Sequence, residues 1–138
     1  MKVNKVVTSF LMDRGKVLIL KRSGLVGTQQ GKWAGVSGYL EGDSPLEHAY
    51  IELEEETRLL KDDVTLINEG DYLDIPDSQK EDIIWRVFPF VFEVKNPQKI
   101  VLDWEHDEMK WVSPSTVKDY ETIPDLFLVL SSVLPGLL

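Results

Sequence analysis

The segment from Ser44 to Leu60 constrains the fold more than any other part of the chain. Ser44 suits the N-cap of a helix, Pro45 suits its first position, and Glu47 completes a Ser-x-x-Glu capping box. At about 100° per residue, one arc centred on Leu53 carries the side chains that we expect to be buried. They are Leu46, Ala49, Tyr50, Leu53, Thr57 and Leu60. The segment therefore predicts an amphipathic helix that packs against a core.

Carboxylates are concentrated on the flank of this helix. Glu52 and Glu56 lie one turn apart beside the buried arc, and Glu55 lies next to them, further round. Like charges at this spacing cost roughly 0.2–0.5 kcal/mol per pair. No lysine occurs between Lys32 and Lys61 to offset that cost. One interpretation is a solvated acidic face, and the other is a divalent-cation site. Converging carboxylates at i, i+3 and i+4 favour the second, because hard cations bind several oxygen ligands.

The stretch 38–59 resembles the Nudix box, whose pattern is Gly-x5-Glu-x7-Arg-Glu-U-x-Glu-Glu-x-Gly-U, with U aliphatic. Gly38 matches the first Gly, residues 52–56 match the Glu-U-x-Glu-Glu core, and Leu59 matches the final aliphatic position. The motif is long and specific. The resemblance covers most of the chain, because Nudix domains have about this size.

Three positions depart from the pattern. Asp43 takes the place of the first Glu in a loop that is one residue shorter, Ile51 replaces the Arg, and Arg58 replaces the late Gly. In the family, that Arg helps to orient the carboxylates. We predict that Arg58 partly replaces it, because Arg58 lies three residues after Glu55 and i,i+3 pairs meet on a helix surface. On the helical wheel, Ile51 points away from the core.

The resemblance implies an α/β fold, a Nudix-like α/β/α sandwich with a mixed β-sheet, and a single Nudix-like domain over residues 1–138. Apolar and β-branched runs predict a hairpin from 3–12 and 17–20, and further strands at 33–36, 64–67, 70–75 and 83–94. Helices are expected at 115–120 and 124–134. Strands with few helices between them indicate a mixed sheet flanked by helices.

The resemblance also implies the site residues. The metal ligands would be Glu52, Glu55, Glu56 and the backbone carbonyl of Ser37, with Mg²⁺, or alternatively Mn²⁺, as the ion. The same three glutamates would be catalytic. Lys21 and Arg22 would contact the phosphates of the substrate, although a solvated strand end explains these two cations equally well.

A second acidic stretch, 103–108, is expected to be a loop that carries a general base or a further ligand. Glu105 and Glu108 are the candidates, and we favour Glu108 as the fourth catalytic residue. His106 could act in this loop or lie on the surface. His48, one turn before Glu52, is expected to be an exposed helix residue. Among the tryptophans, we expect Trp33 and Trp85 in the core, and Trp104 and Trp111 in the core or at its rim.

Length, charge and cysteine content limit the partners. A chain of 138 residues is one domain by length. Its net charge of −9 argues against nucleic-acid polymers and anionic membranes as partners. A small phosphorylated ligand stays possible, because a bound metal inverts the local field. The chain has no cysteine, and we see no signal peptide or membrane span, so we expect a cytoplasmic protein.

These features predict a metal-dependent hydrolase that cleaves the pyrophosphate bond of a nucleoside diphosphate linked to another moiety. The alternative is a catalytically inactive Nudix-fold module that binds nucleotides, and Ile51 and Arg58 motivate it. A plain interaction domain with an acidic helix is a third possibility. The sequence leaves open the nucleotide, which the loops 23–32 and 71–82 would select, and whether the protein is a homodimer.

Overall fold

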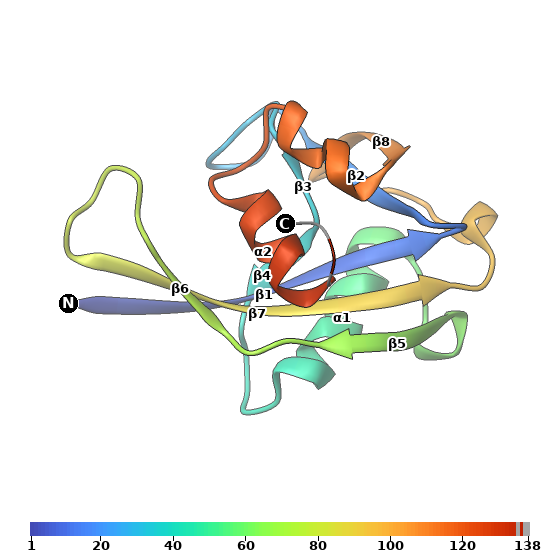
Figure 1. Cartoon of the computed structure of the whole chain (residues 1–138), viewed down its shortest axis with the longest axis horizontal. Helices are drawn as coiled ribbons and strands as arrows, with labels where there is room; N and C mark the ends of the chain where they lie inside the picture. Colours follow the sequence, from blue (N-terminus) through green and yellow to red (C-terminus); the bar gives the residue numbers. More distant parts are fainter. Residues whose placement is uncertain (135, 137–138) are drawn as a thin grey trace.

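The computed structural model describes residues 1–134 and 136 and shows a mixed β-sheet between two α-helices (Figure 1). The strands are β1 (Lys2–Asp13), β2 (Lys16–Arg22), β3 (Trp33–Ala34), β4 (Val36–Tyr39), β5 (Val64–Glu69), β6 (Leu73–Pro76), β7 (Ile83–Val94) and β8 (His106–Val112). The helices are α1 (Pro45–Thr57) and α2 (Leu126–Val133), with short 3-10 turns η1 (Lys61–Asp63), η2 (Pro97–Lys99) and η3 (Pro114–Asp119).

Two long strands, β1 and β7, form the centre of the sheet. They run parallel, from the pair Lys2↔Ile83 to the pair Met12↔Glu93. The other named pairs are antiparallel: β1 with β2 and β4, β2 with β3 and β8, and β7 with β5 and β6. The sheet is therefore mixed, and the predicted α/β/α sandwich is confirmed.

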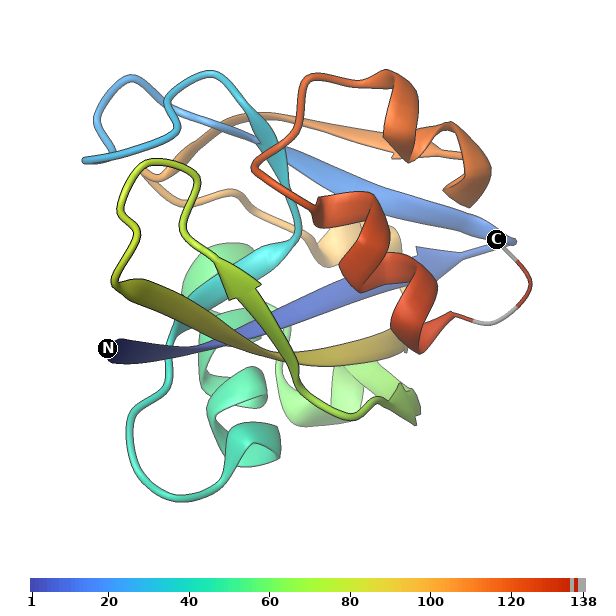
Figure 2. The ribbon, with the colours of Figure 1, turned by 60° about the vertical axis from the view of Figure 1, so that its left-hand side comes forward.

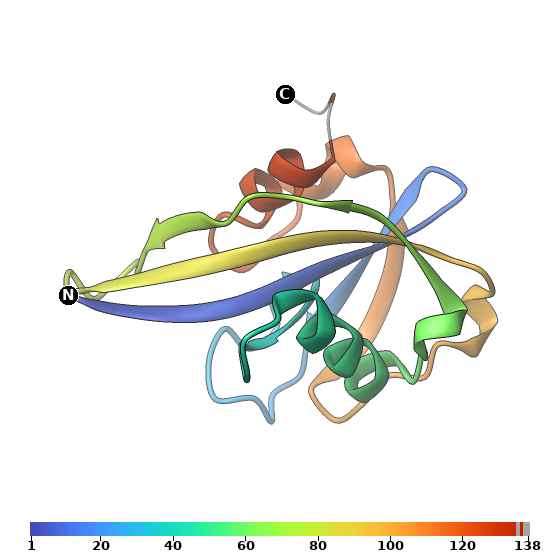
Figure 3. The same ribbon diagram turned by 90° about the horizontal axis from the view of Figure 1, so that it is seen from below.

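Each face of the sheet has its own apolar core, because successive side chains of a strand point to opposite faces. On β1, Val7 and Leu11 belong to the core that α1 covers, whereas Phe10 and Met12 belong to the core that α2 covers. Figure 2 shows α2 in front of the sheet and α1 behind it, and Figure 3 shows the helices on opposite sides. Trp33 packs on the α2 side and Trp111 on the α1 side, both partly buried.

The start of α1 agrees with the sequence prediction, but its end does not. The Ser44 hydroxyl accepts a hydrogen bond from the Glu47 backbone N–H, at 3.2 Å. The helix ends at Thr57, because Arg58 adopts a left-handed conformation with φ 66° and its N–H bonds the Glu54 carbonyl. The prediction that Leu60 lies on the buried arc is wrong.

Other element boundaries shift by a few residues. The predicted strand 70–75 is found at Leu73–Pro76, and the predicted helix 115–120 is a 3-10 turn at Pro114–Asp119. The stretch 103–108 is a loop only in its first half, because β8 begins at His106. Within the described residues, no helix has the length and apolar character that a membrane crossing requires.

Candidate active site

Glu56 is the buried carboxylate at the centre of the candidate site. It lies in the last turn of α1 with only 2% of its surface exposed, and its Oε2 has no hydrogen-bond partner within the described chain. Burial raises the pKa of Glu56 well above its ordinary value. A hydrogen bond with Glu52 and the negative charge of Glu52 raise it further. A carboxyl group in such a place is either protonated or neutralised by a nearby cation.

Glu52 is held between a glycine and a histidine. A Cβ on Gly38 would overlap the Glu52 carboxylate, so only glycine fits at this position without displacing it. On the other side, His48 Nε2 lies 3.0 Å from Glu52 Oε1. His48 is 2% exposed, so the expectation of an exposed helix residue is wrong. The i,i+4 spacing of His48 and Glu52 was the available sequence signal for this pair.

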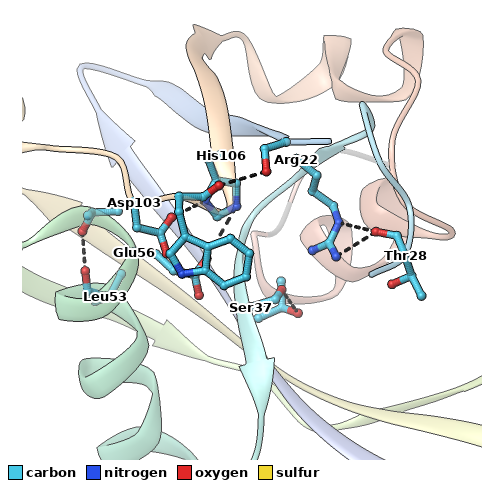
Figure 4. Close-up of polar contacts among 11 residues, drawn as sticks. Arg22, Thr28, Ser37, Leu53, Glu56, Asp103 and His106 are labelled. Atoms are coloured by element: carbon cyan, nitrogen blue, oxygen red, sulfur yellow. Dashed lines mark hydrogen bonds and ion pairs between the residues drawn. The ribbon is translucent and has the colours of Figure 1, made fainter. Parts of the chain in front are cut away.

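A β-bulge turns His106 toward α1. Lys21 pairs with Glu108 and Arg22 pairs with His106, which leaves Asp107 as the extra residue on β8. Such a bulge reverses the alternation of side chains along the strand. Buried His106 therefore reaches Glu56, with 3.6 Å between Nε2 and Oε1. Its Nδ1 lies 3.0 Å from Asp103 Oδ1, and Figure 4 shows these three side chains together.

Burial lowers the pKa of His106, and the hydrogen bond with Asp103 opposes this shift. Of the two options that the sequence left open for His106, the structure shows the buried one. The Asp-x-x-His spacing of residues 103 and 106 could have indicated it.

Glu105, rather than Glu108, lies with Glu56. One ligand atom from each of Glu56, Glu105 and His106 lies within 4.8 Å of the other two. Burial raises the pKa of Glu105, the charges of Asp103 and Glu52 add to that shift, and Arg22 opposes it. This cluster contains carboxylate and imidazole ligands suited to a divalent cation.

Lys21 and Glu108 lie on the opposite face of the sheet. Leu20, which precedes Lys21 on β2, belongs to the core on the α1 side, so the next side chain points toward α2. Lys21 pairs with Glu108 on one side and with Trp33, part of the α2-side core, on the other. The structure therefore does not bring these two predicted site residues to the cluster.

The remaining predicted site residues lie at the rim of the cluster. Glu55 is exposed, and burial followed by the charge of Glu52 raises its pKa. Ser37 precedes Gly38 on β4, and its hydroxyl shares a hydrogen bond of 2.9 Å with that of Thr8. Arg22 donates from Nε and Nη2 to the Thr28 carbonyl, at 3.1 and 2.9 Å, which orients it toward the loop 23–32 (Figure 4).

The predicted contact of Arg58 with the carboxylates of the box is not found. Arg58 lies beyond the helix in its left-handed conformation and forms no ion pair within residues 1–134. Ile51 is 50% exposed, as the helical wheel predicted. The cation that would replace the box Arg is therefore not Arg58, and His48 is the residue that contacts Glu52.

A cleft of about 1010 Å³ opens beside the cluster. Arg22, Ser37, Gly38 and Glu105 line it near the cluster, and the loops 26–29 and 76–80 line it further away. Both loops lie toward the same end of the sheet in Figure 2.

Aromatic side chains form part of the cleft wall. Trp85 packs beside the α2-side core but also lines the cleft, where its ring centroid is 5.8 Å from that of Tyr39. Its Nε1 donates to Asp77 Oδ1 at 2.7 Å, which connects the strand β7 to the loop 77–82. Trp104 lies at the rim, 61% exposed. The cleft therefore has room and aromatic surface for a nucleotide-sized ligand.

Comparisons with known proteins identify the family and agree with the fold. A family model described as NUDIX domain matches residues 2–129. A MutT protein from Methanosarcina mazei is 25% identical with a TM-score of 0.69, over 94% of this chain and 90% of that one. The dihydroneopterin triphosphate pyrophosphohydrolase of E. coli is 18% identical with a TM-score of 0.72, over 94% and 92% of the two chains. An Ap4A hydrolase from C. elegans, in a binary complex, is 17% identical with a TM-score of 0.70, over 96% and 94%. A search of curated proteins gave no match.

Proposed function

This chain belongs to the Nudix family, and from that premise we propose that it is a metal-dependent hydrolase of a nucleotide. It would cleave the pyrophosphate bond of a nucleoside diphosphate linked to another moiety. The observation that carries the proposal is Glu56, a buried carboxylate with an unpaired oxygen beside an open cleft. A domain that only bound partner proteins would gain nothing from burying this charge.

The residues that would hold the metal are Glu52, Glu55, Glu56 and Glu105, with the backbone carbonyl of Ser37. Mg²⁺ or Mn²⁺ would supply charge neutralisation of the pyrophosphate and a lower pKa for the attacking water. Gly38 and His48 both lie close to the carboxylate of Glu52 and limit where it can move, so that ligand would be preorganised.

Glu105, rather than Glu108, would serve this site from the second acidic stretch, as the further metal ligand. It lies beside Glu56 and lines the cleft. Arg22 also lines the cleft and would contact a phosphate, whereas Lys21 points to the other face. Tyr39, Trp85 and Trp104 offer the aromatic surface for a base.

The cleavage test is a substrate panel with the purified protein. The panel should contain ADP-ribose, oxidised nucleoside triphosphates and capped nucleotides. It should also contain dinucleoside polyphosphates and dihydroneopterin triphosphate, because two structural neighbours are named for substrates of these two kinds. We expect hydrolysis in the presence of Mg²⁺ or Mn²⁺, with products that show cleavage of the pyrophosphate bond. Glu56→Gln should abolish turnover, while Glu54→Gln on the exposed face of the same helix should not.

A nucleotide-binding module without activity is the second candidate. Ile51 motivates it, because no arginine stands beside the box carboxylates at that position. Micromolar binding of nucleotides together with no turnover of any panel member would establish it.

Cytoplasmic location is part of our proposal, in keeping with the absence of cysteine.

A further inference from the structure

His106 presents one ring nitrogen to the carboxylate cluster without forming a hydrogen bond there. Its Nε2 lies 3.6 Å from Glu56 Oε1, beyond the range of about 2.7–3.2 Å that N–H donors prefer. Two ligands bound to one ion at roughly 2.1 Å each lie about 3–3.5 Å apart. The separation of Nε2 and Oε1 is therefore closer to that of two ligands than to that of a donor and an acceptor.

Asp103 orients the ring in the manner of a metal-binding histidine. Metal-ligating histidines almost always donate their second N–H to a carboxylate or a carbonyl, which fixes the tautomer and the ring plane. Here Nδ1 lies 3.0 Å from Asp103 Oδ1, so a neutral ring that donates from Nδ1 offers the lone pair of Nε2 to the cluster.

Two carboxylates complete the set. Only 2% of the surface of Glu56 is exposed, and its Oε2 has no hydrogen-bond partner within the described residues. Glu105 places an oxygen within 4.8 Å of both Glu56 and His106. Three side chains, from α1, the loop before β8 and the first residue of β8, thus converge with two oxygen ligands and one nitrogen ligand.

We infer that His106 is a nitrogen ligand of the metal site, and that the site therefore prefers a transition-metal ion such as Mn²⁺ or Co²⁺ over Mg²⁺. Imidazole suits transition metals, whereas Mg²⁺ selects oxygen ligands and retains its waters. The inference rests on the proposed function only in that the same site would serve catalysis.

His48 provides a matched control. It is the only other histidine of the chain, it is also buried, and it also lies beside a box glutamate. Its Nε2 lies 3.0 Å from Glu52 Oε1, but neither of its ring nitrogens has a hydrogen-bond partner among the described residues. His48 thus lacks the carboxylate that orients the ring of His106.

Pulsed electron paramagnetic resonance of the Mn²⁺-loaded full-length chain tests the inference. We expect the ¹⁴N modulation of a coordinated imidazole in the wild type, and its conversion to the ¹⁵N pattern when histidine is labelled. The modulation should be lost in His106→Gln and kept in His48→Gln. Binding of Mn²⁺ without ¹⁴N modulation, or its persistence in a folded His106→Gln, would overturn the inference.

Calorimetric titration adds a second readout that does not need turnover. The wild type should bind Mn²⁺ at least about tenfold more tightly than Mg²⁺ in keeping with the nitrogen ligand. Asp103→Asn, which keeps the side-chain shape, should weaken Mn²⁺ binding by about 10–100-fold. Equal affinities for Mg²⁺ and Mn²⁺ in the wild type would contradict the inference.

Both experiments are done without substrate, so they separate this inference from the proposed hydrolysis. A ¹⁴N signal from His106 in a protein that hydrolyses no panel member supports the inference and removes the enzymatic proposal. Hydrolysis by a protein whose Mn²⁺ shows only oxygen ligands removes the inference alone.

Discussion

Glu56→Gln should stabilise the metal-free protein at neutral pH. Glu56 is buried and one of its oxygens is unpartnered within the described chain. Leaving a buried polar group unsatisfied costs about 1–3 kcal/mol, and more when the group is charged. Glutamine has nearly the same shape and no charge to desolvate. We therefore expect an increase of about 1–3 kcal/mol in the free energy of unfolding, or about 3–5 °C in Tm for each kcal/mol in a chain of this size.

The pH dependence of this gain follows from the direction of the pKa shift. Burial raises the pKa of Glu56 in the folded protein above the ordinary value of 4.5, so the folded state binds this proton more tightly than the unfolded state does. The protein loses this stabilisation as pH rises from about 4.5 through the folded pKa. The advantage of Glu56→Gln should therefore be largest at neutral pH and should disappear near pH 4.

A divalent cation should reverse the order of stability. An ion that binds only the folded state adds RT ln(1+[L]/Kd), about 2.7 kcal/mol at 100 times Kd. The wild type should gain this stability, and Glu56→Gln should gain much less because it lacks one charged ligand. Thermal and chemical denaturation with EDTA and then with Mn²⁺ measure both effects. Glu54→Gln, the same change on the exposed face of α1, is the control at each pH and should be neutral within about 0.5 kcal/mol.

Two results would refute the reasoning about Glu56. A metal-free Glu56→Gln that is less stable than the wild type at pH 7 would show that the carboxylate has a favourable partner. A gain of equal size at pH 4 and pH 7 would show that charge burial is not its cause.

Three further changes test the local geometry of the site. Arg58→Gly should raise the free energy of unfolding by about 1 kcal/mol in denaturant titrations, because φ 66° strains any residue with a Cβ; a loss of metal binding in this variant would return Arg58 to the site. Gly38→Ala should weaken Mn²⁺ binding in calorimetry by displacing Glu52, while Gly24→Ala, which has open space around it, should leave it unchanged; equal affinities would show that Glu52 is not a ligand. His48→Leu should weaken Mn²⁺ binding more than His48→Gln, which retains a donor for Glu52; identical affinities would remove its positioning role.

The sequence determined the elements whose signals are local. The amphipathic period and the capping residues predicted α1 to within three residues at its end, and the turn at Arg14 and Gly15 predicted the hairpin, where both residues adopt positive φ. A long run of aromatic and β-branched residues predicted the strand β7. These features depend on neighbours in the chain, so one sequence suffices to detect them.

The sequence also indicated the centre of the site, because helix geometry places Glu52 and Glu56 on one side of α1. It could not indicate how far each is buried. The two interpretations of the acidic helix, a solvated face and a metal site, differ in what covers Glu56. The residues that cover it come from the loop and strand at 103–112, far along the chain.

Only the tertiary structure decided which residues join the box helix. A single extra residue, Asp107, reverses the side-chain alternation on β8, so His106 faces α1 while Glu108 faces α2. The pairing register of two distant strands sets that bulge, whereas the local Asp-x-x-His spacing of residues 103 and 106 indicates only that these two side chains can meet. Arg58 likewise caps α1 in a left-handed conformation, so the helical i,i+3 geometry that would bring it to Glu55 does not apply. Local periodicity therefore determined the scaffold and the acidic helix, whereas long-range strand register decided which residues lie together in the candidate site.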